Sequence, residues 1–218
     1  MTSFLRIFTP IKISDDSVKR LCFLNNVRSK YLTILLILCA IIFAFYDIRI
    51  LQKTQPFDIF LFHFKSDLVF LVLSFVFALF IFFNQVKTHR EIHIYHKYIH
   101  GIIAMIIMFW SVIKSVVFIK YSDGDYNIAL VCILLTGLIY IFPSTIHLIQ
   151  LSFTIFFALI ISLIFHLTLT NIIQDIYILV IISGISYFAS RYLLHMHLKI
   201  FLKEKELVNY RRKFNTTN

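Results

Sequence analysis

IALVCILLTGLIYIFPSTIHLIQLSFTIFFALIISLIFHLTL, residues 128–169, is the stretch that decides the fold of this chain. A helix needs about 20 apolar residues to cross the hydrocarbon core of a bilayer, and this stretch offers roughly twice that length. Pro143 lacks an amide hydrogen and disfavours helix in the residue before it, while Ser144 can cap a following helix. The sequence therefore predicts a tight hairpin of two membrane-spanning helices, 128–142 and 146–169.

Four further apolar stretches lie at residues 31–46, 68–83, 99–119 and 176–194. The chain of 218 residues is 60% hydrophobic and 15% charged, with a mean hydropathy of +0.86. A soluble domain is nearer to about half apolar and about a quarter charged. We therefore predict an all-α, polytopic membrane protein with six transmembrane helices. The two shortest, 68–83 and 128–142, need flanking residues or local thinning of the bilayer to span it.

The distribution of Lys and Arg predicts the orientation. If the N-terminus is cytoplasmic, 16 of the 21 basic residues fall on the inner side, whereas the acidic residues divide almost evenly. Because short cytoplasmic loops are enriched in Lys and Arg, we predict that both termini are cytoplasmic. The net charge of +10 then indicates attraction to the anionic inner leaflet rather than to nucleic acid. The inner set is Arg6, Lys12, Lys19, Arg20, Arg28, Lys30, Lys87, Arg90, Lys97, Arg191, Lys199, Lys203, Lys205, Arg211, Arg212 and Lys213.

The predicted organisation has three parts. Residues 1–29 form a basic cytoplasmic segment, residues 30–195 the six-helix transmembrane domain, and residues 196–218 a cytoplasmic helix and tail. No small-residue cleavage site follows the first apolar stretch, so we expect a retained anchor rather than a signal peptide. The segment RYLLHMHLKIFLKEKELVNYRRKF, residues 191–214, lacks Gly and Pro and is predicted to continue the sixth helix into the cytoplasm.

Four histidines recur at helical spacing in THREIHIYHKYIHG, residues 88–101. If this segment is helical they share one face, and neutral imidazoles so placed can bind one metal ion. The adjacent histidines found in the boxes of membrane di-iron oxidases do not occur in the chain. Histidines that cover the interface, or a pH- or metal-sensing role, are the other interpretations. The metal-ligand candidates are His89, His93, His96 and His100.

We predict no cofactor and no catalytic activity. The chain has no GxSxG, P-loop, HExxH or paired-carboxylate motif, and His147 and His166 lie too far apart on one predicted helix to share a haem. Lys114 stands inside an apolar stretch, where a charge is a functional candidate. We expect its long side chain to reach the outer interface instead. Asp67 and Asp175 are expected to be solvated at outer helix ends.

The order of features between residues 66 and 214 resembles a known arrangement. A basic, histidine-bearing loop (NQVKTHREIHIYH) is followed by a short acidic outer loop (YSDGDYN), the turn YIFPSTIHLIQ and the exit YFASRYLLHMHLKIFLKEKELVNYRRKF. This is similar to the six-helix membrane region that precedes bacterial GGDEF diguanylate cyclase domains, some adenylate cyclases and some histidine kinases. No GGDEF motif, nucleotide-binding loop or phosphoacceptor domain is present, so no catalytic residue is carried over.

The resemblance implies a sensory or anchoring module of the bacterial inner membrane. Its last helix would relay a signal to a cytoplasmic partner or to a second copy of the chain. A stand-alone sensor, a truncated product and an excised membrane domain all remain open. A small transporter or channel, disfavoured by the lack of clustered intramembrane polar residues, and a His-rich metal-dependent membrane enzyme are the alternatives. The predicted relay residues are Arg191, Leu194, Leu198, Phe201 and Val208.

Overall fold

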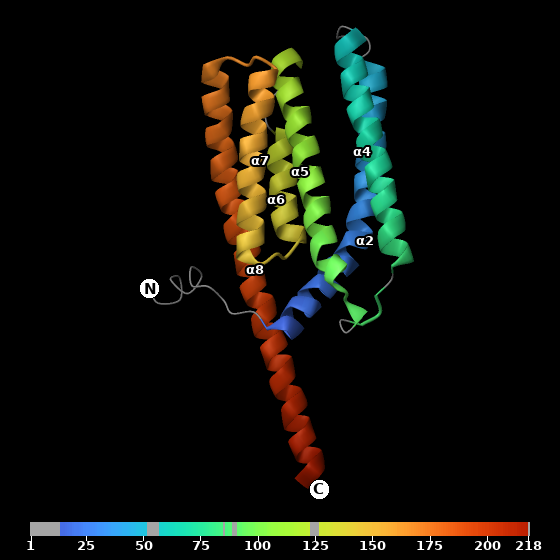
Figure 1. The fold of residues 1–218 in the computed structure, drawn as a ribbon, viewed down its shortest axis with the longest axis vertical. Helices are drawn as coiled ribbons and strands as arrows, with labels where there is room; N and C mark the ends of the chain where they lie inside the picture. Colours follow the sequence, from blue (N-terminus) through green and yellow to red (C-terminus); the bar gives the residue numbers. More distant parts are fainter. Residues whose placement is uncertain (1–13, 52–56, 85, 89–90, 123–126, 218) are drawn as a thin grey trace.

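The computed structural model describes residues 14–51, 57–84, 86–88, 91–122 and 127–217 (Figure 1). Within these ranges every regular element is a helix and no strand occurs, so the predicted all-α class is confirmed. The elements are α2 (Asp15–Tyr46), the π-helix η1 (Asp47–Leu51), α4 (Phe57–Phe83), α5 (Ile94–Ser122), α6 (Asn127–Ile139), α7 (Ser144–Ile164) and α8 (Leu169–Thr217).

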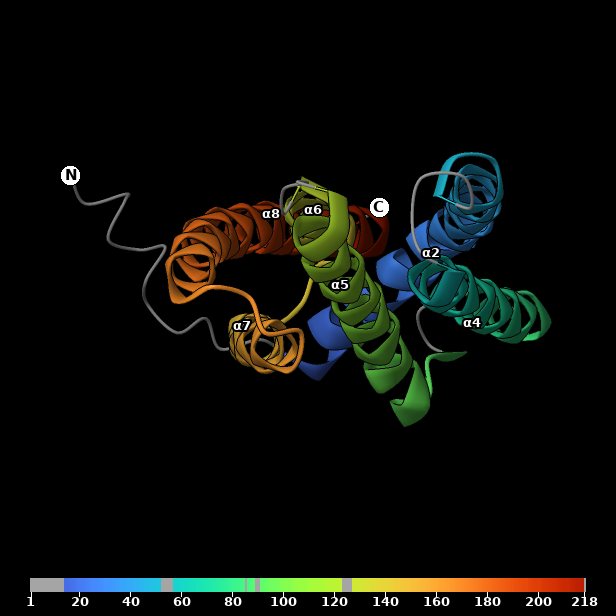
Figure 2. The same cartoon turned by 90° about the horizontal axis from the view of Figure 1, so that it is seen from above.

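Successive helices alternate in direction, and they form two groups (Figures 1 and 2). The later part of α2 and α4 stand on one side of α5, and α6, α7 and α8 stand on the other, while the beginning of α2 passes α5 and reaches α8. The beginning of α2 and the far end of α8 lie at the same end of the molecule. The lower part of α8 extends well beyond the ends of the neighbouring helices.

Five of these helices are long and apolar enough to cross a membrane, as the sequence predicts. The exception is α6, whose 13 residues give about 20 Å of helix against about 30 Å of hydrocarbon. The sixth span therefore stays a prediction. The five spans are Asp15–Arg49, Phe60–Phe83, Tyr98–Tyr121, Thr145–Ile164 and Leu169–Phe214.

Helix boundaries differ from the predicted division of the chain. The first helix begins at Asp15, well inside the segment 1–29, because Ser14 caps it by accepting a hydrogen bond from the Ser17 amide. At the other end, α8 runs through residue 195 without a break, as predicted for a sixth helix that continues through residues 191–214. The predicted boundaries at residues 29 and 195 thus lie within continuous helices.

The hairpin between α6 and α7 forms as predicted, but its capping differs. Pro143 rather than Ser144 occupies the N-cap position of α7, without a side-chain cap hydrogen bond, and Ser144 is the first helical residue. The chain between the two helices is non-helical from Tyr140 to Pro143. Such backbone is tolerated at membrane depth only where protein groups satisfy its hydrogen bonds.

Side chains of α2 supply those hydrogen bonds. Asn25 Nδ2 donates to the Ile141 carbonyl oxygen, and the Ile141 amide donates to Asn25 Oδ1, each at 3.0 Å. Arg28 Nη1 donates to the Ile139 carbonyl at 2.9 Å. The first half of α2 is therefore fastened to the end of α6.

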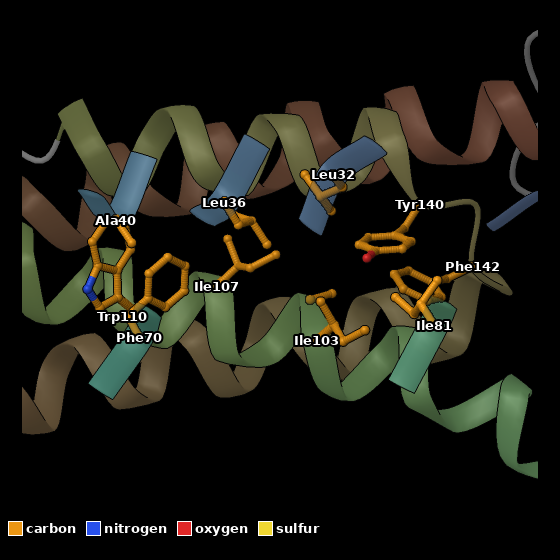
Figure 3. Packing of buried hydrophobic residues seen from close by; sticks show 11 residues of the cluster. Leu32, Leu36, Ala40, Phe70, Ile81, Ile103, Ile107, Trp110, Tyr140 and Phe142 are labelled. Atoms are coloured by element: carbon orange, nitrogen blue, oxygen red, sulfur yellow. The ribbon is translucent and has the colours of Figure 1, made fainter. Parts of the chain in front are cut away.

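An aromatic and aliphatic core joins the two groups of helices (Figure 3). The rings of Phe70 and Trp110 stack with centroids 4.1 Å apart, which packs α4 against α5. Leu36 of α2 and Ile107 of α5 extend this core along the helices. A second cluster, which includes Val112, Ile133, Leu151 and Leu179, packs α5, α6, α7 and α8 together.

Gly137 of α6 lies close against α8. A Cβ atom at this position would clash with Ser186 Oγ and lie 3.0 Å from the Ser186 carbonyl oxygen. Small residues at helix interfaces let backbones approach in this way. Ser186 Oγ donates to the Ile133 carbonyl at 2.9 Å, so the same contact is also a polar one.

Candidate functional site

Lys114 of α5 is the centre of a buried charge cluster. Its Nζ lies 2.7 Å from Asp67 Oδ1 and donates a hydrogen bond of 3.2 Å to Asp47 Oδ2. The Lys114 side chain is 1% exposed and both carboxylates are 0% exposed. The expectation that Lys114 reaches the interface is therefore wrong, as is the expectation that Asp67 is solvated. The reason is that two carboxylates on neighbouring helices hold the ammonium inside.

His63 completes the Lys114 cluster, which we define as Asp47, His63, Asp67 and Lys114. Lys114 Nζ lies 3.2 Å from His63 Nδ1 and 3.3 Å from the His63 carbonyl oxygen. An ammonium group only donates hydrogen bonds, so Nδ1 must be the accepting nitrogen of a neutral imidazole. This assignment places the imidazole proton on Nε2, away from the lysine.

Three elements position the cluster. Asp47 is the residue at which α2 passes into the π-helix η1, a type of helix that is often found at functional sites. His63 and Asp67 are four residues apart on α4 and share one face of that helix. Lys114 comes from the second half of α5. The cluster therefore joins the α2–α4 pair to α5.

Aromatic side chains surround the cluster. The Phe118 ring lies 5.2 Å from His63 and 6.4 Å from Tyr46, measured between centroids. Phe62 contacts Phe165, which lies just beyond the end of α7, with ring centroids 5.7 Å apart. Because the cluster is buried, the lower local dielectric strengthens the interactions between its charges.

A buried ion pair is weak evidence of stability, because taking charges out of water costs several kcal/mol per ion. Apolar side chains of similar size in place of the lysine and both aspartates would avoid that cost. Ionisable residues inside membrane segments therefore point to function by default. The Lys114 cluster is the arrangement of this kind that the described residues present most clearly.

The predicted histidine site does not form among the described residues. His93 precedes α5, whereas His96 and His100 lie on it and are 2% and 1% exposed. His89 lies outside the described residues. Where the structure is described, no group of three or more His, Cys, Asp or Glu side chains could hold a metal ion. The expected shared face fails because the helix begins at Ile94.

His100 instead belongs to an internal hydrogen-bond network. Its Nδ1 lies 3.0 Å from Ser29 Oγ, which in turn donates to the Tyr140 hydroxyl at 3.1 Å. These contacts join α2, α5 and the non-helical segment after α6. Burial lowers the pKa of the neighbouring His96. His100 thus connects α5 to α2 through Ser29.

The predicted relay residues of α8 fall into two sets. Leu194 and Leu198 are buried, and they pack with Leu21 of α2 and Ile141. Phe201 is partly buried beside them, and Arg191 is also buried. Val208 is 48% exposed. The apolar stripe thus begins as an internal contact with α2 and ends on an exposed helix.

A salt bridge marks the place where α2 and α8 separate. Arg20 Nη1 lies 3.1 Å from Glu204 Oε2, and the Arg20 guanidinium lies 5.5 Å from the centroid of the Phe201 ring. An exposed pair of this kind contributes less than about 1 kcal/mol to stability. The salt bridge matters mainly because it connects the beginning of α2 to α8 at the point where α8 leaves the helix bundle.

An apolar cavity of about 340 Å³ lies apart from the Lys114 cluster, between α2, α5 and α6. Leu36, Trp110 and Val131 are among the residues that line it, and no charged residue does. In a bilayer such a hollow suits acyl chains and offers nothing to a charged ligand. It is not a candidate for specific polar recognition.

No protein-family model, characterised protein or solved structure matches this chain. The fold and the site therefore define a class only. The chain is an all-helical protein with five helices fit to cross a membrane, and it contains a buried Lys–Asp–Asp–His cluster.

Proposed function

We propose that this chain is a sensory or anchoring module of the bacterial inner membrane, with six transmembrane helices and cytoplasmic termini. In this proposal α8 relays a signal to a cytoplasmic partner or to a second copy of the chain. The observation that carries the proposal is the form of α8, a single helix of 49 residues whose side chains from 202 to 214 are all exposed.

The length of α8 exceeds what a membrane span requires. At 1.5 Å per residue the helix is about 70 Å long, more than twice the thickness of the hydrocarbon core. Helices that stand alone in water derive little stability from propensity and depend on packing. The projecting half of α8 is therefore expected to pack against another helix or domain.

The exposed part of α8 carries an apolar stripe suited to that packing. Leu207, Tyr210 and Phe214 are 61%, 70% and 69% exposed and recur at spacings of three and four. This spacing is typical of a helix that buries one face against a partner helix. Val208 of the predicted relay set lies about 100° around the helix from Leu207 and is not part of this stripe.

The path of α2 supports a relay from the opposite end of the membrane domain. Asp47, at one end of α2, belongs to the Lys114 cluster, whereas Arg20, near the other end, contacts Glu204 of α8. The two residues are about 40 Å apart along the helix axis. A change at the cluster that moves α2 would therefore reach the exit of α8.

Reporter fusions after His100, Asp125, Pro143, Asn171 and Asn218 test the proposed topology. We expect cytoplasmic signals at His100, Pro143 and Asn218 and periplasmic signals at Asp125 and Asn171. A periplasmic signal at Asn218 would place the exposed part of α8 in the periplasm and would overturn the relay proposal. A periplasmic signal at Pro143, matching that at Asp125, would show that α6 does not cross and would overturn the count of six spans.

A small transporter or channel is the second candidate, and the Lys114 cluster favours it. The sequence argument against transport was the lack of clustered intramembrane polar residues, and the cluster removes that argument. Flux of ions across proteoliposomes, abolished by Lys114→Met, would support transport. Unchanged flux relative to empty liposomes would leave the sensory proposal as the better account. The metal-dependent enzyme gains no support from the described histidines.

A further inference from the structure

The formal charges of the Lys114 cluster do not balance. Lys114 contributes one positive charge, Asp47 and Asp67 can contribute two negative charges, and His63 is neutral as a hydrogen-bond acceptor. Among the described residues, these are the titratable groups that α2, α4 and α5 present to the site. Arg49 and Lys65 lie on exposed surfaces of the same segments. Full ionisation would leave one uncompensated negative charge in the protein interior.

Such a charge is strongly disfavoured in a buried site. An isolated carboxylate that loses its hydration becomes protonated rather than staying charged. Two carboxylates that share one site also repel each other, so one of them tends to take up a proton. Both effects act here, because the two side chains are 0% exposed and contact the same ammonium nitrogen.

We infer that the Asp47–Asp67 pair is a proton-binding site that holds one exchangeable proton beside a charged Lys114. The proton belongs to the pair, since strongly interacting carboxyl groups titrate together and not as separate residues. In the protonated state the cluster is neutral, with one ammonium, one carboxylate, one carboxylic acid and one neutral imidazole. Release of the proton leaves a single negative charge at the end of α2.

The geometry favours a proton over a metal cation. The Lys114 nitrogen already lies within 3.2 Å of oxygens from both carboxylates, which is the position that a cation such as Na⁺ would need. A second positive ion there would be repelled by the ammonium. A proton requires no such space, because it binds to one carboxylate oxygen.

The cluster lies close to one end of its helices. Asp47 is the residue after the end of α2, and Lys114 is about two helical turns before the end of α5. In the predicted orientation this is the outer side, so the proton would exchange with the periplasm. If this proton is the signal that α8 relays, that part of the inference rests on the proposed function and deepens it. The binding of the proton by the Asp47–Asp67 pair is independent of the proposed function.

Infrared spectroscopy of the full-length chain in lipid nanodiscs tests the inference directly. A protonated carboxyl group has a C=O stretch that is separate from that of a carboxylate and shifts in heavy water. We expect one such group per chain at neutral pH, lost on raising the pH. Absence of the band in the wild-type protein would overturn the inference, whatever the variants do.

Variants test whether the C=O band of the protonated carboxyl group comes from the Asp47–Asp67 pair. Asp47→Asn and Asp67→Asn should each abolish it, because the remaining carboxylate is balanced by Lys114. Lys114→Met should increase it to two groups per chain, because both carboxylates then lose their cation. Asp15→Asn, an exposed control outside the cluster, should leave it unchanged. A band that persists in both Asn variants would overturn the inference.

Two further readouts separate the alternatives. If Na⁺, compared with choline, raises the melting temperature of the wild type but not of Asp67→Asn, and the band is absent, the site binds a metal cation and the inference fails. Cysteine cross-linking at Leu207 reports on the exit of α8. A proton band with pH-independent cross-linking would keep the proton site and refute the relay. pH-dependent cross-linking without a proton band would refute the proton site and keep the relay.

Discussion

Asn25 and Ile141 exchange two hydrogen bonds of 3.0 Å, so that one side chain of α2 satisfies both backbone groups of a residue outside the helices. The arrangement fixes the level at which α6 ends. It also explains how three consecutive non-helical residues can be buried, since Tyr140, Ile141 and Phe142 are 0%, 1% and 4% exposed.

Asn25→Leu should destabilise the protein, because it leaves the amide and carbonyl of Ile141 without partners. The expected loss is about 1–3 kcal/mol, the cost of leaving buried polar groups unsatisfied. Thermal unfolding in detergent, followed by circular dichroism, measures it. Asn26→Leu is a matched control, because Asn26 is equally buried but its Nδ2 finds no hydrogen-bond partner among the described residues. Equal effects of the two changes would contradict the assigned role of Asn25.

Lys114→Met should lower stability by about 3–5 kcal/mol at high pH, because it strands two buried carboxylates. The loss should shrink as the pH falls, since both carboxyl groups can then become neutral. Adding Asp47→Asn and Asp67→Asn to Lys114→Met should restore much of the stability at high pH. Lys120→Met, an exposed lysine on the same helix, should have little effect. Melting curves across a pH series would show whether the loss depends on pH as expected.

Gly137→Ala should cost about 1–3 kcal/mol, because the new methyl group clashes with Ser186 and forces α6 away from α8. Gly184→Ala on α8 is the matched control, since a Cβ there meets nothing within 4 Å. Replacement of an unhindered helical glycine by alanine typically stabilises a helix by about 0.5–1 kcal/mol. The two changes should therefore shift the melting temperature in opposite directions. A shift in the same direction would argue against the close α6–α8 contact.

Cysteines placed along the exposed part of α8 should reveal which face meets a partner. In a background without the native cysteines, Leu207→Cys and Tyr210→Cys should form disulfide-linked dimers in membranes if a second copy is the partner. Lys205→Cys, on the opposite side of the helix, should not. Cross-linking that is uniform around the helix would indicate random collisions. A lack of cross-linking at all three positions would exclude a parallel α8 dimer and favour a different cytoplasmic partner.

The positions of the helices could be predicted from the sequence, because apolar stretches of sufficient length have few alternatives to membrane helices. The hairpin at Pro143 followed from proline chemistry. The extent of α2 did not, since its first half is polar and gains its helical structure by packing on α8 and on Ile141.

The Lys114 cluster was harder to foresee, because its members are separated by 67 residues between Asp47 and Lys114 and lie on three elements. Asp47 and Asp67 alone look like residues near helix ends, and the long side chain of Lys114 could have reached the interface from its apolar stretch. A signal was nevertheless present, since His63 and Asp67 stand four residues apart beside an apolar stretch. That spacing places both side chains on one face of the helix. The next long helix in the chain carries Lys114 inside an apolar stretch, where a charged side chain needs a partner.

If α2 moves as one rigid body, its fastening makes it a lever with unequal arms. Asn25 binds the segment that follows α6 and Ser29 binds His100, so these two contacts are the point about which α2 would turn. From Asn25 the arm to Asp47 is about 33 Å long, whereas the arm to Arg20 is only about 8 Å. A rigid rod pivoting there reduces displacement roughly fourfold and multiplies force in the same ratio. A slight separation of charges at the long end would thus become a small but forceful push at the short one.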